Sequence, residues 1–319
     1  MLTPIPVTGP AAAPALTVAQ LSAAELRARL RGPGLRLRTG PFVVALRSTI
    51  AEVADGITLM YADYPVLGPE HFADFHMNMA EASGWHRWVR PQVHFLPDGD
   101  APFQPLPRHH AFALFEWSFN WCISGRAHDW LILHAAVVEK DGCAAILPAP
   151  PGSGKSTLCA ALAHRGWRLL SDELTLISLT DGLITPVPRP ISLKNASLAV
   201  MRAYVPGAVF SKSVHDTSKG VVTLMKPPAA SVARAHELAR PAWVVFPKYE
   251  SGAAASLCSV APARAFMQLA ENSFNYNLLG AAGFEAMAGL VERSTSYQFT
   301  YSVLDEAIAV FDALPRPAQ

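Results

Sequence analysis

Residues 147–157 carry the clearest chemical signal in the sequence, Leu-Pro-Ala-Pro-Pro-Gly-Ser-Gly-Lys-Ser-Thr. A glycine-containing run that ends in Gly-Lys-Ser-Thr is typical of a loop that binds phosphate groups. An apolar run at 143–147 precedes it, and residues 156–164 place apolar side chains at the spacing of one helix face. We therefore predict a buried strand, a phosphate-binding loop and then a helix, which is the context that gives the motif its chemistry.

The residue types in this loop suit a nucleoside triphosphate. Gly152 and Gly154 let backbone N–H groups turn toward an anion, and the positive end of the helix dipole adds to the attraction. Lys155 supplies a charge for the terminal phosphates, and Ser156 supplies a hydroxyl for Mg²⁺. ATP and Mg²⁺ are therefore the predicted ligands, held by Pro151, Gly152, Ser153, Gly154, Lys155, Ser156 and Thr157.

Ala149 departs from the usual pattern G-x-x-x-x-G-K-[ST], because it stands where the first glycine belongs. An alanine fits there only with a negative φ, and Pro150 and Pro151 stiffen the loop. The alternative interpretation is a Gly-Ser turn that precedes Lys-Ser-Thr by chance. The coincidence of strand, helix and Gly-Lys-Ser-Thr core favours the phosphate loop.

Asp172 and Glu173 follow an apolar strand, at a point where carboxylates could reach the phosphate loop. Adjacent side chains of a strand point to opposite faces, so one carboxylate can face a metal ion while the other faces an acceptor hydroxyl. The alternative is a solvated strand end. His134 lies on a neighbouring strand and could pair with Asp172 and tune its pKa. A purely structural histidine is the alternative there.

The elements that position these residues are predicted from hydrophobic periodicity and turn signals. Asp-Gly pairs at 141–142 and 181–182 indicate hairpin turns, so the loop strand should pair antiparallel with the strand that carries His134. Residues 186–195 read as a Pro-rich connection and 215–220 as a polar loop. We predict helices at 17–30, 50–61, 108–126, 156–164, 262–270, 283–293 and 305–314, the first of them capped by Thr17 or Ser22. Strands are predicted at 35–38, 42–46, 73–79, 93–95, 129–138, 143–147, 166–171, 174–177, 221–224 and 242–246.

These elements predict an α/β fold with a mixed sheet around the loop and a smaller N-terminal α+β domain. The expected division is a disordered leader at 1–16, an N-terminal unit at 17–106, a phosphate-loop domain at 107–314 and a tail at 315–319. An aromatic cluster at 85–88 in the N-terminal unit is assigned to packing rather than to a ligand site.

Composition excludes several classes of protein. A chain of 319 residues that is 51% hydrophobic has ample core, and a net charge of +1 gives no electrostatic case for nucleic acid or anionic membrane. No apolar run reaches the roughly 18 residues that span a bilayer. The first 16 residues lack Lys and Arg, unlike a signal peptide, and the four cysteines lack metal-ligand spacing. Reduced thiols and a cytoplasmic location are expected.

The residues from His134 to Glu173 resemble the catalytic domain of HPr kinase/phosphorylase. That family has a histidine–glycine strand, a phosphate loop, and a helix that ends in Arg-Gly-His-Arg before two aspartates. Here residues 165–168 read Arg-Gly-Trp-Arg, and Ala135 replaces the glycine. The chain is most similar to the group called HPr-kinase-related kinase A, also over residues 190–195, 215–217, 246–249 and 272–276.

The resemblance implies the HPr kinase/phosphoenolpyruvate carboxykinase fold and an ATP-dependent serine kinase. Asp172 would be the base or orienting group on the acceptor hydroxyl, His134 would lie near that base, and Glu173, in place of the second aspartate, would hold Mg²⁺. Asp172 and Ser156 complete the implied metal set. Further candidates for polar contacts at the site are Lys194, Asp216 and Lys219.

The resemblance also implies a peptide or small protein as the acceptor, delivered by a PqqD-like peptide chaperone, and it leaves a homo-oligomer open. Two alternatives remain at this stage. A small-molecule kinase would use the same phosphate cradle with another acceptor. A nucleotide-dependent, non-catalytic scaffold is allowed by the departures at Ala149 and Glu173.

Overall fold

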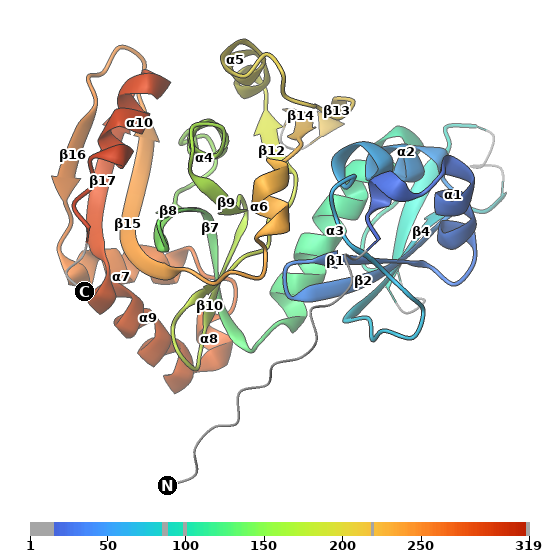
Figure 1. Ribbon diagram of the computed structural model, residues 1–319, viewed down its shortest axis with the longest axis horizontal. Coiled ribbons are helices and arrows are strands. Elements are labelled where there is room, and N and C mark those ends of the chain that lie inside the picture. Colours follow the sequence, from blue (N-terminus) through green and yellow to red (C-terminus); the bar gives the residue numbers. More distant parts are fainter. Residues whose placement is uncertain (1–15, 85–88, 98–100, 218–219, 317–319) are drawn as a thin grey trace, which may run out of the picture.

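The computed structural model describes residues 16–84, 89–97, 101–217 and 220–316. Two α/β parts lie side by side, with helix α3 (Ala111–Arg126) between them (Figure 1). The predicted leader up to residue 15, the aromatic cluster at 85–88, Lys219 and the last three residues of the tail lie outside the described residues. Within the described part, none of the helices is long and apolar enough to cross a membrane.

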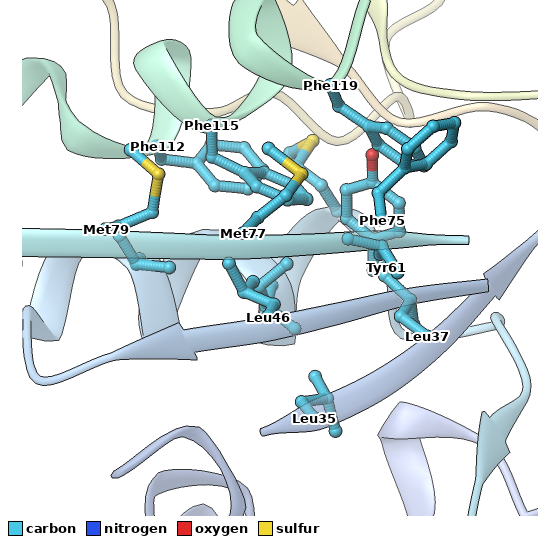
Figure 2. Close-up of a cluster of buried hydrophobic side chains, with 14 of the residues drawn as sticks. Leu35, Leu37, Leu46, Tyr61, Phe75, Met77, Met79, Phe112, Phe115 and Phe119 are labelled. Atoms are coloured by element: carbon cyan, nitrogen blue, oxygen red, sulfur yellow. The ribbon is translucent and has the colours of Figure 1, made fainter. Parts of the chain in front are cut away.

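The N-terminal part is a six-stranded sheet in the order β3-β1-β2-β4-β5-β6, with β2 and β4 parallel and the other pairs antiparallel. Helices α1, α2 and α3 pack on one face of it. Figure 2 shows phenylalanine rings of α3 against Met77 and Met79 of β4. The elements are α1 (Ala23–Arg31), β1 (Leu35–Thr39), β2 (Phe42–Ser48), α2 (Ala51–Met60), β3 (Val66–Leu67), β4 (Phe75–Glu81), β5 (Gln92–Pro97) and β6 (Leu106–Pro107).

Of the two caps predicted for the helix at 17–30, Ser22 is confirmed, and a start at residue 17 is wrong. Residues Val18–Gln20 form a single 3-10 turn, and α1 begins only at Ala23. Ser22 caps the helix: its hydroxyl accepts the N–H of Glu25, whose carboxylate accepts the N–H of Ser22 at 2.8 Å. This reciprocal pairing satisfies two end groups of α1, so the helix starts there and not at residue 17.

The second part is built on an eight-stranded mixed sheet in the order β11-β10-β7-β8-β15-β17-β16, with β9 also paired to β7. The predicted antiparallel hairpin of β7 and β8 is confirmed, as is the one of β10 and β11. On the other side, β15 runs parallel to β8, and β17 runs parallel to β15. The strands are β7 (Trp130–Lys140), β8 (Cys143–Pro148), β9 (Arg168–Ser171), β10 (Leu174–Ser178), β11 (Ile184–Thr185), β15 (Arg240–Tyr249), β16 (Ser256–Ser259) and β17 (Thr295–Tyr301).

Helices cover both faces of this sheet (Figure 1). One face packs against α4 (Lys155–Ala163) and α10 (Leu304–Asp312), and α5 (Ala196–Tyr204) packs against α4. The opposite face packs against α7 (Pro262–Glu271), α8 (Tyr276–Leu279) and α9 (Ala281–Arg293). The helices predicted at 156–164, 262–270, 283–293 and 305–314 are confirmed within two residues at each end. The short α6 (Ala229–Ala233) packs near β9.

A third sheet corrects two predicted connections. It contains β12 (Ile191–Lys194), β14 (Gly220–Met225) and β13 (Val214–Thr217), in that order and antiparallel. Strand β12 lies in the segment read as Pro-rich, and β13 lies in the segment read as a polar loop. Both strands are only four residues long, so neither presents enough alternation to be distinguished from a loop by periodicity.

One hydrophobic cluster crosses from the first part to the second. It contains Phe115 and Phe119 of α3, residues of β1 and β4, and Leu174 and Leu176 of β10. Helix α3 therefore contributes to both parts, and residues near the acidic pair share a core with the N-terminal sheet. The domain boundary at 106–107 stays a prediction.

Candidate functional site

The phosphate loop connects β8 to α4, as the sequence predicts. Strand β8 ends at Pro148 and α4 begins at Lys155, with Gly154 as its N-cap. Gly152 and Gly154 both have left-handed backbones, with φ of 88° and 87°. Ala149 is not among the described residues with a positive φ. An alanine can therefore take the place of the motif's first glycine without backbone strain.

The two glycines differ in what surrounds them, which gives a matched pair of substitutions. A Cβ on Gly154 would lie 2.5 Å from the Tyr301 hydroxyl and 2.9 Å from Tyr249 Cβ, whereas a Cβ on Gly152 would meet nothing within 4 Å. If the loop binds ATP, as the sequence predicts, Gly154→Ala should abolish that binding by displacing the loop. Gly152→Ala has only the left-handed strain of about 1–2 kcal/mol to absorb and is expected to keep measurable binding. Isothermal titration checks both; equal losses would contradict the steric account.

Lys155 lies in the loop as a buried cation. Its side chain is 8% exposed, and its Nζ has no hydrogen-bond partner among the described residues. The hydroxyl of Ser153 is also buried, and none of the described residues hydrogen-bonds it. A buried ammonium group that makes no hydrogen bonds is costly. An anion at the start of α4 would relieve that cost, so this cradle fits a phosphate group.

Asp172 lies in the bend between β9 and β10, where it faces the loop. Its Oδ2 accepts the backbone N–H of Ser192 at 3.0 Å, and the nearby hydroxyl of Ser156 acts to lower its pKa. Its Oδ1 is buried, and nothing in the described chain hydrogen-bonds it. Burial, together with the negative charge of Glu173, raises the pKa of Asp172 to about 6, against the lowering effect of Lys155.

His134 pairs with Glu173, so the prediction that it pairs with Asp172 is wrong. The His134 Nε2 lies 3.1 Å from Glu173 Oε2. The physical reason is the register of β7 and β10, which sets His134 opposite Leu174 and brings its chain neighbour Glu173 within reach. Asp172 turns away toward Ser156 and Ser192 instead.

Glu173 remains a carboxylate. Its burial tends to raise the pKa, but the hydrogen bond from His134 and the charges of Lys155 and Lys194 outweigh burial and hold the pKa well below its usual range. The two adjacent carboxyls therefore differ: one is held ionised, and the other titrates near neutral pH. Pairs of acids whose pKa values are pushed apart are typical of catalytic sites.

The remaining predicted residues divide into two groups. Lys194, at the end of β12, acts electrostatically on Glu173 and so belongs to the site. Asp216 lies instead beside His110, and the Thr157 hydroxyl donates to Ser197 of α5 at 2.9 Å. The roles assigned to individual residues in catalysis and in ligand binding stay predictions.

The metal site that the loop implies depends on ligands from outside the chain. Within the residues that the structure describes, no group of three His, Cys, Asp or Glu side chains could hold a metal ion. Mg²⁺ is commonly held by one or two carboxylates, with phosphate oxygens and water completing its shell. Ser156 at the start of α4 and the ionised carboxylate of Glu173, on which the charge of Lys155 acts, fit that arrangement.

A cavity of about 50 Å³ adjoins the acidic pair. Its wall contains Asp172 and Glu173, and also Trp117, Asn120 and Arg189 from the junction of the two parts. Arg189 is buried and paired with Glu116 at 2.6 Å. Arg189 was not predicted from the sequence, because only its place in a Pro-Arg-Pro run distinguishes it. Ser192 was not predicted either, because the sequence of β12 reads as a connection.

No protein-family model matches the chain, and no curated protein matches it. Among solved structures, the Hpr(Ser) kinase/phosphatase from Coxiella burnetii is similar at 10% identity and a TM-score of 0.26. The match covers 57% of this chain and 95% of that one. At these values, the function must be argued from the geometry of the site itself.

Proposed function

We propose that this chain is an ATP-dependent serine kinase that acts on a peptide or a small protein. The proposal rests on one observation: the phosphate loop follows the carboxyl end of β8, and the acidic pair follows the carboxyl end of β9 at the same end of the sheet. The loop contains a buried, unpaired lysine, and the two acids have pKa values shifted in opposite directions. A phosphate cradle alone would suit any nucleotide-binding protein, whereas the acidic pair supplies what phosphoryl transfer needs in addition.

The loop residues 151–156 hold the phosphates through backbone N–H groups, and Lys155 neutralises the terminal ones. Ser156 and the carboxylate of Glu173 would hold Mg²⁺, which leaves Oδ1 of Asp172 to act on the acceptor. The metal, when bound, neutralises charge that develops on the phosphate oxygens. The ammonium group of Lys155 is buried and makes no hydrogen bond within the described residues, so a phosphate would supply its missing partner.

Asp172 receives the proton of the acceptor hydroxyl in this proposal. Its Oδ1 is the carboxyl oxygen without a partner in the described chain, while Oδ2 is held by the N–H of Ser192. A pKa of about 6 leaves it ionised at neutral pH yet basic enough to take a proton in the transition state. Glu173, fixed by His134, stays anionic throughout.

A peptide acceptor is favoured over a metabolite because the cavity at the acidic pair is small. About 50 Å³ accommodates the end of a side chain rather than a whole substrate. The rest of such an acceptor would lie outside, where a PqqD-like chaperone could deliver it and the N-terminal part could contact it. A cytoplasmic location and a homo-oligomeric assembly belong to the same proposal.

The test is mass spectrometry of peptides encoded beside this chain's gene, after incubation with the protein, ATP and Mg²⁺. A gain of one phosphate on a serine is expected, and Lys155→Ala should reduce it at least about 100-fold, because a preorganised charge at the transferring group is lost. Lys140→Ala, which removes an exposed partner of Asp312, is the matched control and should leave transfer unchanged.

Two other results would overturn the proposal. Transfer to members of a metabolite panel, with none to peptides, would make the chain a small-molecule kinase. ATP binding without transfer or stimulated hydrolysis, in the presence of the candidate peptides and chaperone, would make it a nucleotide-dependent scaffold.

A further inference from the structure

The order of the central sheet determines where the base of a bound nucleotide can lie. The acidic pair lies on one side of β8, beyond β7, whereas β15 and β17 lie on the other side (Figure 1). The reacting phosphate must face the acidic pair, so the sugar and base must extend the opposite way. Because β8, β15 and β17 are parallel, their carboxyl ends meet at the edge that carries the loop, where ligands of open α/β sheets bind.

Two tyrosines occupy the carboxyl ends of these strands. Tyr249 ends β15, Tyr301 ends β17, and the register pairs them directly. Paired residues of parallel strands point to the same face of a sheet, and Tyr301 belongs to the core under α4. Both side chains therefore lie on the face of the sheet that α4 covers, beside the start of that helix.

The tyrosines contact the phosphate loop through its backbone. The Tyr249 N–H donates to the Ser153 carbonyl at 2.9 Å, and the Tyr301 hydroxyl donates to the Gly154 carbonyl at 3.0 Å. Tyr301 is buried, and burial raises the pKa of its phenol, so it keeps the proton that it donates. The hydroxyl of Tyr301 therefore serves to hold the phosphate loop in place.

Tyr249 holds the loop through its backbone N–H, and within the described residues no hydrogen bond of its phenol hydroxyl accounts for its ring. The residue is 49% exposed, although its Cβ lies against Gly154 and its ring meets Tyr301 nearly edge to face at 5.8 Å. The chain neighbours Lys248 and Glu250 pair with each other at 2.7 Å, so their charges compensate one another. An aromatic ring that is half exposed and anchored on one side is suited to stack with a flat, uncharged ring system.

We propose that Tyr249 is the stacking platform for the purine base of the nucleotide. This inference rests on the proposed function for the position of the phosphates, and it adds the residue that binds the base. Stacking of a base on an aromatic side chain is commonly worth about 1–3 kcal/mol, which corresponds to a loss of roughly five- to 150-fold in affinity when the ring is removed.

The test compares ATP with inorganic tripolyphosphate, which offers the same phosphates without a base. Isothermal titration in Mg²⁺ is performed on the wild type, Tyr249→Ala, Tyr249→Phe and Phe284→Ala. The last variant removes an aromatic ring of similar exposure, 55%, from α9. We expect Tyr249→Ala to weaken ATP binding about tenfold and to leave tripolyphosphate binding unchanged, with Tyr249→Phe and the control close to wild type.

Two outcomes would overturn the inference. Unchanged ATP binding in Tyr249→Ala would show that the base lies elsewhere, and peptide phosphorylation by the same preparation would leave the kinase proposal intact. An equal loss for ATP and tripolyphosphate would mean that Tyr249 acts on the loop and not on the base. A wild type that binds neither ligand would remove the proposed function and this inference together.

Discussion

Asp172→Asn is expected to lower phosphoryl transfer at least about 100-fold and, at pH 7, to raise the melting temperature of the nucleotide-free protein by about 2–6 °C. In the proposed mechanism, the loss of activity follows from the loss of the oxygen that would take the proton of the acceptor hydroxyl. The gain in stability follows from the burial of the carboxyl, which is 4% exposed. Asn retains an oxygen that can accept the N–H of Ser192.

The sign of the stability effect comes from the raised pKa. The carboxyl of Asp172 has a pKa of about 6 in the fold, against an ordinary value of 3.8, chiefly because burial disfavours its charged form. The folded state therefore binds this proton more tightly than the unfolded chain, and stability falls as the pH rises between those two values. The full difference at neutral pH is about 3 kcal/mol, part of which Asn recovers.

Glu173→Gln is the matched control at the adjacent position. Its carboxyl has a lowered pKa, since His134 and the nearby lysines outweigh burial, so its charge stabilises the fold at pH above 4.5. This substitution is expected to lower the melting temperature at pH 7. Melting curves between pH 4 and pH 7 decide the matter: the advantage of Asp172→Asn should vanish near pH 4, and a gain that persists there would refute the titration argument.

The parts of the site that lie within one stretch of chain could be predicted from the sequence. The strand, loop and helix around Lys155 follow from a local pattern, and the β7–β8 hairpin follows from the Asp-Gly turn at 141–142. Each of these signals lies within a few residues of the structure that it specifies, so no knowledge of the tertiary fold is needed.

The parts that depend on register or on distant segments could not be predicted. Which acid His134 meets is decided by the offset between β7 and β10, and a shift of one residue would change the answer. Ser192 reaches Asp172 from twenty positions along the chain. Tyr249 becomes a neighbour of the loop only through the parallel pairing of β8 and β15, which has no turn signal.

Glu116→Ala is expected to destabilise the protein by about 3–5 kcal/mol, the largest loss among the substitutions considered. Glu116 of α3 is 3% exposed, lies 2.6 Å from Arg189 and accepts the hydroxyl hydrogen of Tyr61 at 2.6 Å. Removing the carboxylate leaves a buried guanidinium without its counter-charge. Asp55→Ala, at an exposed ion pair with Arg27, is the control and should cost less than about 1 kcal/mol.

Denaturant unfolding measures this loss, and a double-mutant cycle identifies its origin. If the buried pair is responsible, Glu116→Ala combined with Arg189→Met should cost less than the sum of the two single substitutions. If the losses in free energy of unfolding are additive, the effect of Glu116→Ala comes from the packing of α3 instead.

The same pair gives the N-terminal part a physical connection to the acidic pair. Arg189 lies three residues before Ser192, whose N–H holds Asp172, and the Tyr64 hydroxyl donates to the Pro188 carbonyl at 2.8 Å. The milder Glu116→Gln retains hydrogen-bonding groups but removes the charge. It should therefore slow transfer more than it weakens ATP binding, because the segment that orients Asp172 loosens while the phosphate loop does not. Equal effects on phosphoryl transfer and on ATP binding would show that the N-terminal part does not influence the orientation of Asp172.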